Sequence, residues 1–151
     1  MSQKSYQDFP LGRDAIMEIL PHRDPMLFIE TVLAADEKNL HAQTRVDPDW
    51  PVFQGHFPEF PIMPGVLLIE TVAQAGALIL GLNGAVPDDS FIGFSSVEQA
   101  KFRRAVKPDD LMEVHVELTR ERHGFFKFEG RIEVENLLAA EVKFAAAQMS
   151  L

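Results

Sequence analysis

The sequence predicts an α+β domain in which a curved antiparallel sheet covers one long apolar helix. Residues Val66–Leu82 (VLLIETVAQAGALILGL) form an apolar run with a single charge, at Glu70. About six further segments alternate apolar and polar residues with the period of a strand, and most of them follow this run. A helix that is apolar on nearly every side must be surrounded by protein. Strands with one polar face predict the antiparallel sheet that would surround it.

The chain before the apolar run predicts a short helix, two strands and a rigid loop. Arg13–Leu20 (RDAIMEIL) puts apolar side chains on one helical face, and Pro21 ends that helix. Met26–Ala34 and Leu40–Val46 are predicted to be strands, the second with regular alternation. Phe53–Gly65 (FQGHFPEFPIMPG) contains three prolines, so we expect a loop there and neither a helix nor a central strand.

The chain after the apolar run predicts a turn and four strands. Asn83–Asp89 (NGAVPDD) combines glycine and proline with short polar residues, as turns do. The four strands are expected at Phe91–Phe102, Leu111–Leu118, Phe125–Val134 and Ala139–Ala146. Because no repeat or linker divides the chain, residues 1–151 are predicted to form a single domain, with a flexible N-terminus at residues 1–12.

Composition excludes several classes of function. The 151 residues are 46% apolar and 25% charged, which is ordinary for a soluble domain. The absence of cysteine excludes disulfides and thiolate metal sites, and it favours a cytoplasmic location. The N-terminus lacks the apolar run of a secretory signal. A net charge of −9 argues against nucleic acid as a partner.

The apolar run is a poor membrane span. A spanning helix needs roughly 20 apolar residues. This run is shorter and carries Glu70, Thr71 and Gln74. We therefore expect a core helix and no membrane span.

His56 is the first candidate for a catalytic residue. It lies in the proline-rich loop, where Pro61 and Pro64 restrict the backbone and can hold an imidazole in one place. A structural histidine with both ring nitrogens satisfied is the alternative that position alone leaves open. His41 and His115 lie on polar strand faces, where we expect them to be solvated. His123 lies in a turn, and His22 ends the first helix, where a cation is favoured by the helix dipole, so none of these four is expected to be catalytic.

Glu70 is the second candidate. One interpretation is a partly exposed glutamate near the start of a helix, favoured by the helix dipole. The other is a buried carboxyl among Leu68, Ile69 and Val72, whose pKa would be raised so that it holds a proton and acts as a general acid. Gln74 lies four residues further on the same helical face and can hydrogen-bond to it, and we also expect Gln74 to help bind the substrate.

Gly65 opens the predicted helix, whose first amides have no partner within the helix. A glycine there lets a substrate oxygen approach these amides closely. Base, acid and oxyanion site together suit proton removal next to a carbonyl and loss of a β-hydroxyl. The sequence contains no zinc-binding pair, phosphate loop or dinucleotide fingerprint, so neither a metal nor a cofactor is expected.

Several motifs occur in an order that resembles one enzyme family, the 3-hydroxyacyl-acyl carrier protein dehydratases of the FabZ type. The resemblance covers nearly the whole chain from about residue 13. The motifs are ILPHR (Ile19–Arg23), GHFP (Gly55–Pro58), PIMPGV (Pro61–Val66), ETVAQAG (Glu70–Gly76), KFRR (Lys101–Arg104) and KFEG (Lys127–Gly130).

The resemblance implies a hotdog fold and dehydration of (3R)-3-hydroxyacyl-acyl carrier protein to the trans-2-enoyl product in fatty-acid biosynthesis. His56 would take the C2 proton, Glu70 of the partner subunit would protonate the C3 hydroxyl, and the Gly65 amide would bind the thioester carbonyl. The tyrosine that gates the acyl tunnel in some relatives is absent, and the candidates for its place are Phe91, Phe94 and Phe102.

The same resemblance implies the partners. They are an acyl carrier protein with its phosphopantetheine-linked substrate, and a second copy of the chain, with trimers of dimers in some family members. An acidic carrier needs a local positive patch, which Lys101, Arg103, Arg104 and Lys107 can form. Solvated charge at a strand edge explains these four residues equally well.

Two other functions remain open at this point. A hotdog acyl thioesterase also buries a carboxylate on its central helix, but the GHFP histidine loop argues against it. A non-catalytic acyl-binding subunit is the third possibility, and the presence of both His56 and Glu70 argues against it.

Overall fold

The computed structural model describes residues 8–150, and it contains two α-helices, one 3-10 helix and six strands. In chain order these are α1 (Arg13–Ile19), β1 (Thr31–Ala35), β2 (Asn39–Arg45), η1 (Pro51–Gln54), α2 (Gly65–Leu82), β3 (Ser90–Phe102), β4 (Leu111–Arg122), β5 (Phe125–Val134) and β6 (Leu137–Ser150).

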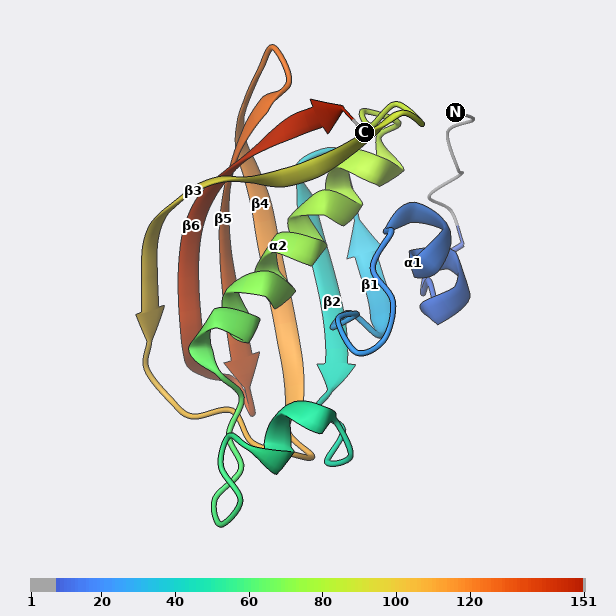
Figure 1. Cartoon of the computed structure of the whole chain (residues 1–151). Helices are drawn as coiled ribbons and strands as arrows, with labels where there is room; N and C mark the ends of the chain where they lie inside the picture. Colours follow the sequence, from blue (N-terminus) through green and yellow to red (C-terminus); the bar gives the residue numbers. More distant parts are fainter. Residues whose placement is uncertain (1–7, 151) are drawn as a thin grey trace.

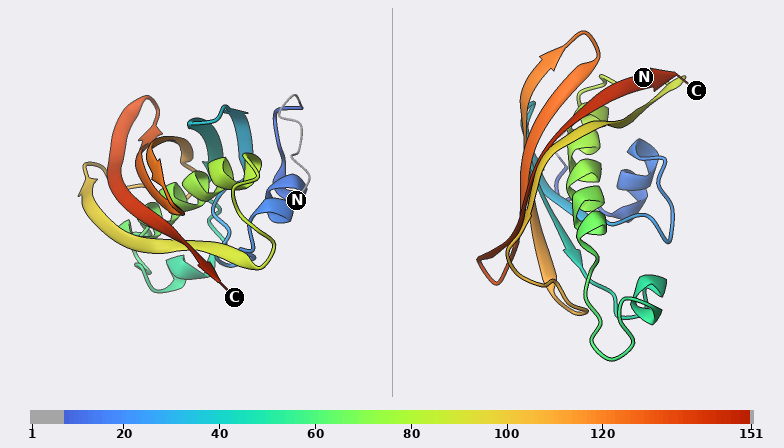
Figure 2. Two further views of the ribbon diagram at one scale, coloured as in Figure 1. Left: turned by 90° about the horizontal axis from the view of Figure 1, so that it is seen from above. Right: turned by 60° about the vertical axis from the view of Figure 1, so that its left-hand side comes forward.

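The six strands form one antiparallel sheet in the order β1-β2-β4-β5-β6-β3. The sheet curves around α2, which lies across its concave face, while α1 packs beside the C-terminal half of α2 (Figures 1 and 2). The predicted α+β architecture, a helix covered by a curved antiparallel sheet, is therefore confirmed.

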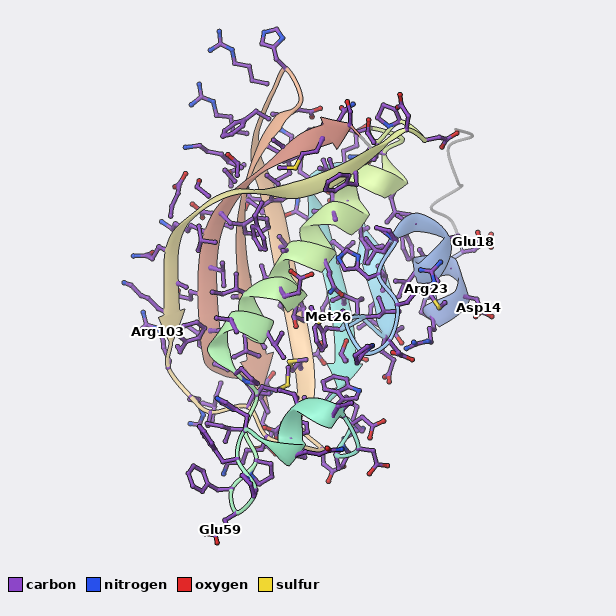
Figure 3. All side chains as sticks on the ribbon, in the orientation of Figure 1. Asp14, Glu18, Arg23, Met26, Glu59 and Arg103 are labelled. Atoms are coloured by element: carbon purple, nitrogen blue, oxygen red, sulfur yellow. The ribbon has the colours of Figure 1, made fainter. Side chains whose placement is uncertain are left out.

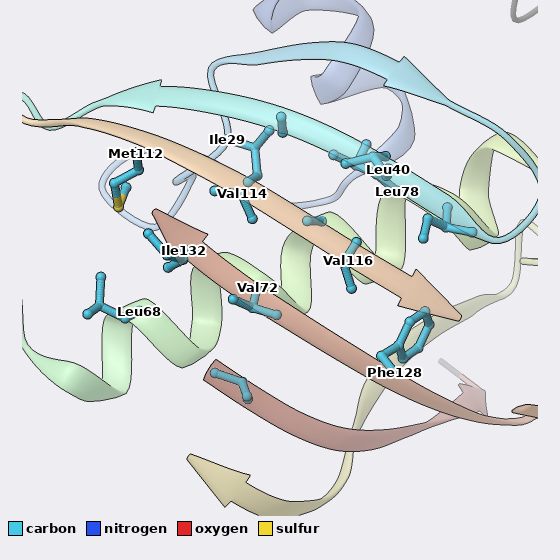
Figure 4. Packing of buried hydrophobic residues seen from close by; sticks show 14 of the residues in the cluster. Ile29, Leu40, Leu68, Val72, Leu78, Met112, Val114, Val116, Phe128 and Ile132 are labelled. Carbon is cyan, nitrogen blue, oxygen red and sulfur yellow. The ribbon is translucent and has the colours of Figure 1, made fainter. Parts of the chain in front are cut away.

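The core forms where α2 meets the inward faces of β4 and β5. Val72 and Leu78 of the helix lie against Val114, Ile132 and their neighbours, all of them fully buried (Figure 4). Burying each such side chain stabilises the fold by about 1.5–3 kcal/mol. Gly130 of β5 permits this close approach, because a Cβ there would lie 2.4 Å from Cγ1 of Val72.

The first predicted strand is shorter than expected. The ladder begins at Thr31 because the main chain before it bonds to side chains. The amide of Phe28 donates to Oε1 of Gln74 (2.8 Å), and the hydroxyl of Thr44 donates to the Phe28 carbonyl (2.7 Å). Thr44 also accepts from the amide of Glu30 (2.9 Å). This stretch thereby connects the sheet to α2.

The structure describes only part of residues 1–12, the segment predicted to be flexible. Residues 1–7 of the segment predicted to be flexible lie outside the described residues. Leu11 forms a two-bond bridge with Val32 (both 2.9 Å), and Phe9 packs against the core. The part of the segment around these two residues is therefore held against the sheet.

The central helix has the composition of a membrane span but the surroundings of a core helix. Gly65–Leu82 has a mean hydropathy of 1.8 and is long enough to cross a membrane by length and composition alone. More than half of this segment, 56%, is buried inside the protein. Its apolar surface is therefore largely used in packing against the sheet.

Candidate active site

The loop after η1 fixes the orientation of the His56 ring. The amide of Ile62 donates to the His56 carbonyl (3.1 Å), and Nδ1 of His56 lies 2.9 Å from the Ile62 carbonyl. Phe57 stacks on the imidazole with ring centroids 4.1 Å apart. A carbonyl only accepts, so Nδ1 carries the hydrogen and Nε2 keeps its lone pair. The half-buried ring is thus arranged to accept a proton at Nε2.

Glu70 lies in the second turn of α2, where two donors reach the same carboxyl oxygen. Nε2 of Gln74 lies 3.1 Å from Oε1, and Nε2 of His22 lies 3.2 Å from it. The Glu70 side chain retains 21% exposure, so the carboxyl is neither fully buried nor free in solvent. The predicted bond between Gln74 and Glu70 is confirmed, and His22 is an additional partner.

The pKa of Glu70 is lowered from its ordinary value. Burial is the largest single influence and raises the pKa, but the hydrogen bonds from His22 and Gln74 outweigh it. The raised pKa expected from the sequence is therefore wrong for this chain. That expectation assumed a carboxyl surrounded only by aliphatic residues of its own helix, and it could not include a donor from the loop after α1.

Gln74 acts as the connector between α2 and the stretch before β1. Its side chain is 1% exposed, and Nε2 donates both to Glu70 and to the carbonyl of Met26 (2.7 Å). Its Oε1 accepts from the amide of Phe28. Both N–H groups of Gln74 are therefore used within the chain, where they support Glu70 and the Met26 carbonyl.

Gly65 is the first residue of α2, and its amide has no hydrogen-bond partner within residues 8–150. A Cβ at this position would lie 2.9 Å from the Phe102 ring of β3. Glycine is therefore required by packing as well as by the open amide. The free N–H at the positive end of the helix can bind a developing oxyanion.

The chain matches the sequence model of a known protein family. The FabA-like domain matches residues 20–143, which include His56, Gly65 and Glu70. The chain belongs to the FabA-like family.

Curated relatives of this FabA-like chain carry an enzyme name. The 3-hydroxyacyl-[acyl-carrier-protein] dehydratase FabZ of Albidiferax ferrireducens is 42% identical over 135 residues, covering 87% of this chain and 90% of the relative. The FabZ protein of Vibrio campbellii is 43% identical over 134 residues, covering 86% and 89%. The family resemblance noted in the sequence is thereby confirmed.

Solved structures confirm the hotdog fold. A chain of the dehydratase heterocomplex ApeI:P from Xenorhabdus doucetiae superposes with a TM-score of 0.75 at 20% identity, covering 89% of this chain and 91% of that one. The PaaI protein of E. coli gives a TM-score of 0.62 at 14% identity, covering 77% and 80%. At these identities the likeness shows the fold alone.

His56 and Glu70 have different hydrogen-bond partners in this FabA-like chain. No hydrogen bond or ion pair joins them among the described residues, and His56 faces the Ile62 carbonyl, whereas Glu70 faces His22 and Gln74.

The contact of His22 with Glu70 was missed in the sequence analysis, although His22 lies in the ILPHR motif. Arg23 fixes this loop by donating to the carbonyls of Leu20 (2.9 Å), His22 (2.7 Å) and Met17 (3.1 Å). Figure 3 shows Arg23 beside α1. The motif was the only available signal, because the contact between His22 and Glu70 spans two separate elements.

A hollow of about 490 Å³ lies beside α2 and includes His22 in its wall. Its other walls come from α1, the C-terminal half of α2 and the start of β3, with Leu20, Ala77, Val86 and Phe91 among the apolar lining. Of the three candidate gating phenylalanines, Phe91 lines this hollow. Phe102 instead packs over Gly65, and Phe94 contacts the Phe144 ring edge to face.

The predicted basic residues lie at and after the end of β3, and all four are exposed. Arg103 donates twice to Glu141 (3.0 and 2.8 Å), so part of its charge is offset. Among the described residues, no ion pair involves Lys101, Arg104 or Lys107. Figure 3 shows Arg103 outside the lower end of β3.

Proposed function

We propose that this protein is a dehydratase that converts (3R)-3-hydroxyacyl-acyl carrier protein to the trans-2-enoyl thioester in fatty-acid biosynthesis. The observation that carries this proposal is the 42–43% identity to FabZ dehydratases over most of both chains. The orientation of His56 and the open amide of Gly65 supply the chemistry that such a reaction needs.

In the proposed mechanism His56 removes the proton at C2. Its Nε2 lone pair takes the proton, and the C–H electron pair moves toward the thioester carbonyl. The Gly65 amide stabilises the negative charge that develops on the carbonyl oxygen, and one such donor is worth roughly 3 kcal/mol.

Glu70 acts on the C3 hydroxyl. The C3–O bond breaks, the new C2–C3 double bond forms, and the proton from Glu70 leaves with the hydroxyl as water. An acyl chain in the channel expels the remaining solvent around the carboxyl, and loss of solvent raises a carboxyl pKa. Substrate binding thus shifts Glu70 toward the protonated form, while in the free chain its pKa is lowered.

Each active site is proposed to combine His56 of one subunit with Glu70 of another. Support comes from the family resemblance and from β3, an edge strand with exposed Phe94, Val97 and Phe102. An apolar, unpaired strand edge is covered when two copies pair along it. Trimers of such dimers remain the proposed higher assembly.

The proposed macromolecular partner is an acyl carrier protein in the cytoplasm. Its acidic surface would dock on Lys101, Arg104 and Lys107. These residues lie near Phe102 in the chain, and the Phe102 ring packs over Gly65. Arg103 contributes less because of its contact with Glu141.

A single assay separates this function from the two alternatives. The purified protein is incubated with an enoyl thioester while enone absorbance and free thiol are followed together. We expect loss of enone without thiol release, which is hydration, the reverse reaction. Thiol release would indicate a thioesterase, and a folded sample with neither activity would indicate an acyl-binding subunit.

Substitution of the two proposed catalytic residues tests their assignment. We expect His56→Ala and Glu70→Gln each to reduce hydration by at least about a hundredfold, since general base and acid catalysis contribute factors of that order. Thermal melting of each variant serves as the control for folding. Near-normal turnover in either folded variant would contradict the role proposed for that residue.

A further inference from the structure

His22 makes a direct contact with Glu70 that the proposed mechanism does not use. Resting on the proposed dehydratase function, we propose that His22 is a positioning residue: with Gln74 it occupies Oε1 of Glu70 and so confines the acid proton to Oε2. The acid would then be a unit of three side chains, of which only Glu70 touches the substrate.

The first argument is that both neighbours of Oε1 are donors. Gln74 presents an amide N–H at 3.1 Å, and its own oxygen is already bound to the amide of Phe28, which fixes the orientation of the amide. His22 presents Nε2 at 3.2 Å. A carboxyl oxygen that accepts two N–H bonds cannot also carry a hydrogen toward them. The proton of the neutral acid must therefore lie on Oε2.

The second argument concerns the state of the His22 ring. Its Nδ1 is buried and has no hydrogen-bond partner within the described part of the chain. A buried N–H without an acceptor is costly, so the ring hydrogen is placed on Nε2 and not on Nδ1. This tautomer donates its N–H to Glu70.

The third argument is that the loop holding His22 is rigid. Three bonds from Arg23 to main-chain carbonyls, including that of His22 itself, fix the segment between α1 and β1. Pro21, directly before His22, has a fixed φ and further restricts the main chain of this loop. The ring also lines the hollow of about 490 Å³ beside α2.

The proton count is balanced without a proton from His22. The C2 proton goes to Nε2 of His56, the C3–O bond breaks, and the Oε2 proton joins the leaving oxygen as water. Glu70 is left ionised, with Oε1 still bound to His22 and Gln74. The proton on His56 returns to Glu70 through solvent when the product leaves.

The test compares His22→Ala with His22→Gln, which keeps an N–H donor of similar reach. We expect kcat for hydration of an enoyl thioester to fall about tenfold or more in His22→Ala, with a smaller change in KM, and to recover in part in His22→Gln. His41→Ala is the matched control, because His41 bonds to Glu113 (2.5 Å) on the outer face of the sheet. It should keep wild-type kcat.

The pH profile supplies a readout that a merely structural role would not move. His22 is one of two donors that lower the pKa of Glu70, and Gln74 is the other. Removing the His22 side chain takes away one of the hydrogen bonds that counteract burial, so the pKa of Glu70 rises. In the dehydration direction the protonated acid is the active form, so dehydration falls as pH rises through this pKa. We expect that alkaline limb of kcat, measured on a 3-hydroxyacyl thioester, to lie at higher pH in His22→Ala than in wild type.

Three results would overturn the inference: wild-type kcat in His22→Ala, a pH limb that does not move, or His22→Gln no more active than His22→Ala in samples with equal melting temperatures. Failure of the proposed function looks different, because wild-type protein would then fail to hydrate the thioester at all.

Discussion

At the residue scale, the distinctive feature is that two N–H donors, from Gln74 and His22, lie at the same carboxyl oxygen of Glu70. The sequence identified Glu70, Gln74 and their mutual bond from helical spacing alone. It did not identify His22, because a pattern within one element carries no information on which loop packs against it. The error in the pKa of Glu70 follows directly from that missing neighbour.

Gln74 offers a prediction at this scale. In Gln74→Leu the buried amide of Phe28 loses its acceptor and the Met26 carbonyl loses a donor. Each unpaired buried group costs about 1–3 kcal/mol, so we expect the free energy of unfolding to fall by about 2–4 kcal/mol. Urea denaturation measures this change.

Gln74→Glu is the companion variant, because it keeps the acceptor for Phe28 and removes the donors. We expect it to lose activity and to retain more stability than Gln74→Leu. Equal stability of Gln74→Leu and wild type would show that these three bonds contribute nothing to the fold.

At the element scale, the helix and the alternating strands were predictable because each reflects a local period in the sequence. Gly65–Leu82 and β4 to β6 agree with the predicted segments within a few residues, apart from longer ends of β4 and β6. The exceptions have specific causes. Met26–Glu30 lies outside the strands because its main chain bonds to Gln74 and Thr44. The 3-10 helix η1 begins at Pro51.

The packing of α2 on β5 gives a prediction for Gly130. In Gly130→Ala the new Cβ would lie 2.4 Å from Val72 and 3.1 Å from the main-chain carbonyl of His115. Such overpacking costs about 1–3 kcal/mol, so we expect the melting temperature to fall. Gly12→Ala is the control, since a Cβ there meets nothing within 4 Å.

The double variant Gly130→Ala/Val72→Ala distinguishes overpacking from loss of backbone freedom. It removes the methyl group that the new Cβ would meet. We expect the two changes together to cost less than the sum of the single changes. Strict additivity would contradict the close-approach explanation.

At the scale of the whole molecule, strand order and chain pairing were not accessible from local patterns. The order β1-β2-β4-β5-β6-β3 places the strand after α2 at the far edge, beside the last strand of the chain. This arrangement leaves β3 as an exposed edge, next to the basic residues that follow it. The cross-subunit site was expected only from the family resemblance.

The basic residues after β3 predict how a charged partner is recognised. Arg104→Glu should lower kcat/KM for a carrier-bound substrate more than for a small thioester, because only the former brings an acidic surface. Arg103→Glu should have a smaller specific effect, since Glu141 already offsets that charge. The difference should shrink at high salt. Equal losses on both substrates would contradict docking at this surface.

The central claim is that one active site takes His56 and Glu70 from different chains, and mixing two inactive variants tests it most directly. His56→Ala and Glu70→Gln chains are co-expressed with different tags, and hydration is measured on the complexes that carry both. A mixed dimer has one site with both residues intact, so we predict about half of the wild-type activity in purified mixed dimers. Mixed dimers of His56→Ala with the double variant should stay inactive. Mixed dimers of the two single variants that are as inactive as their parents would contradict the claim.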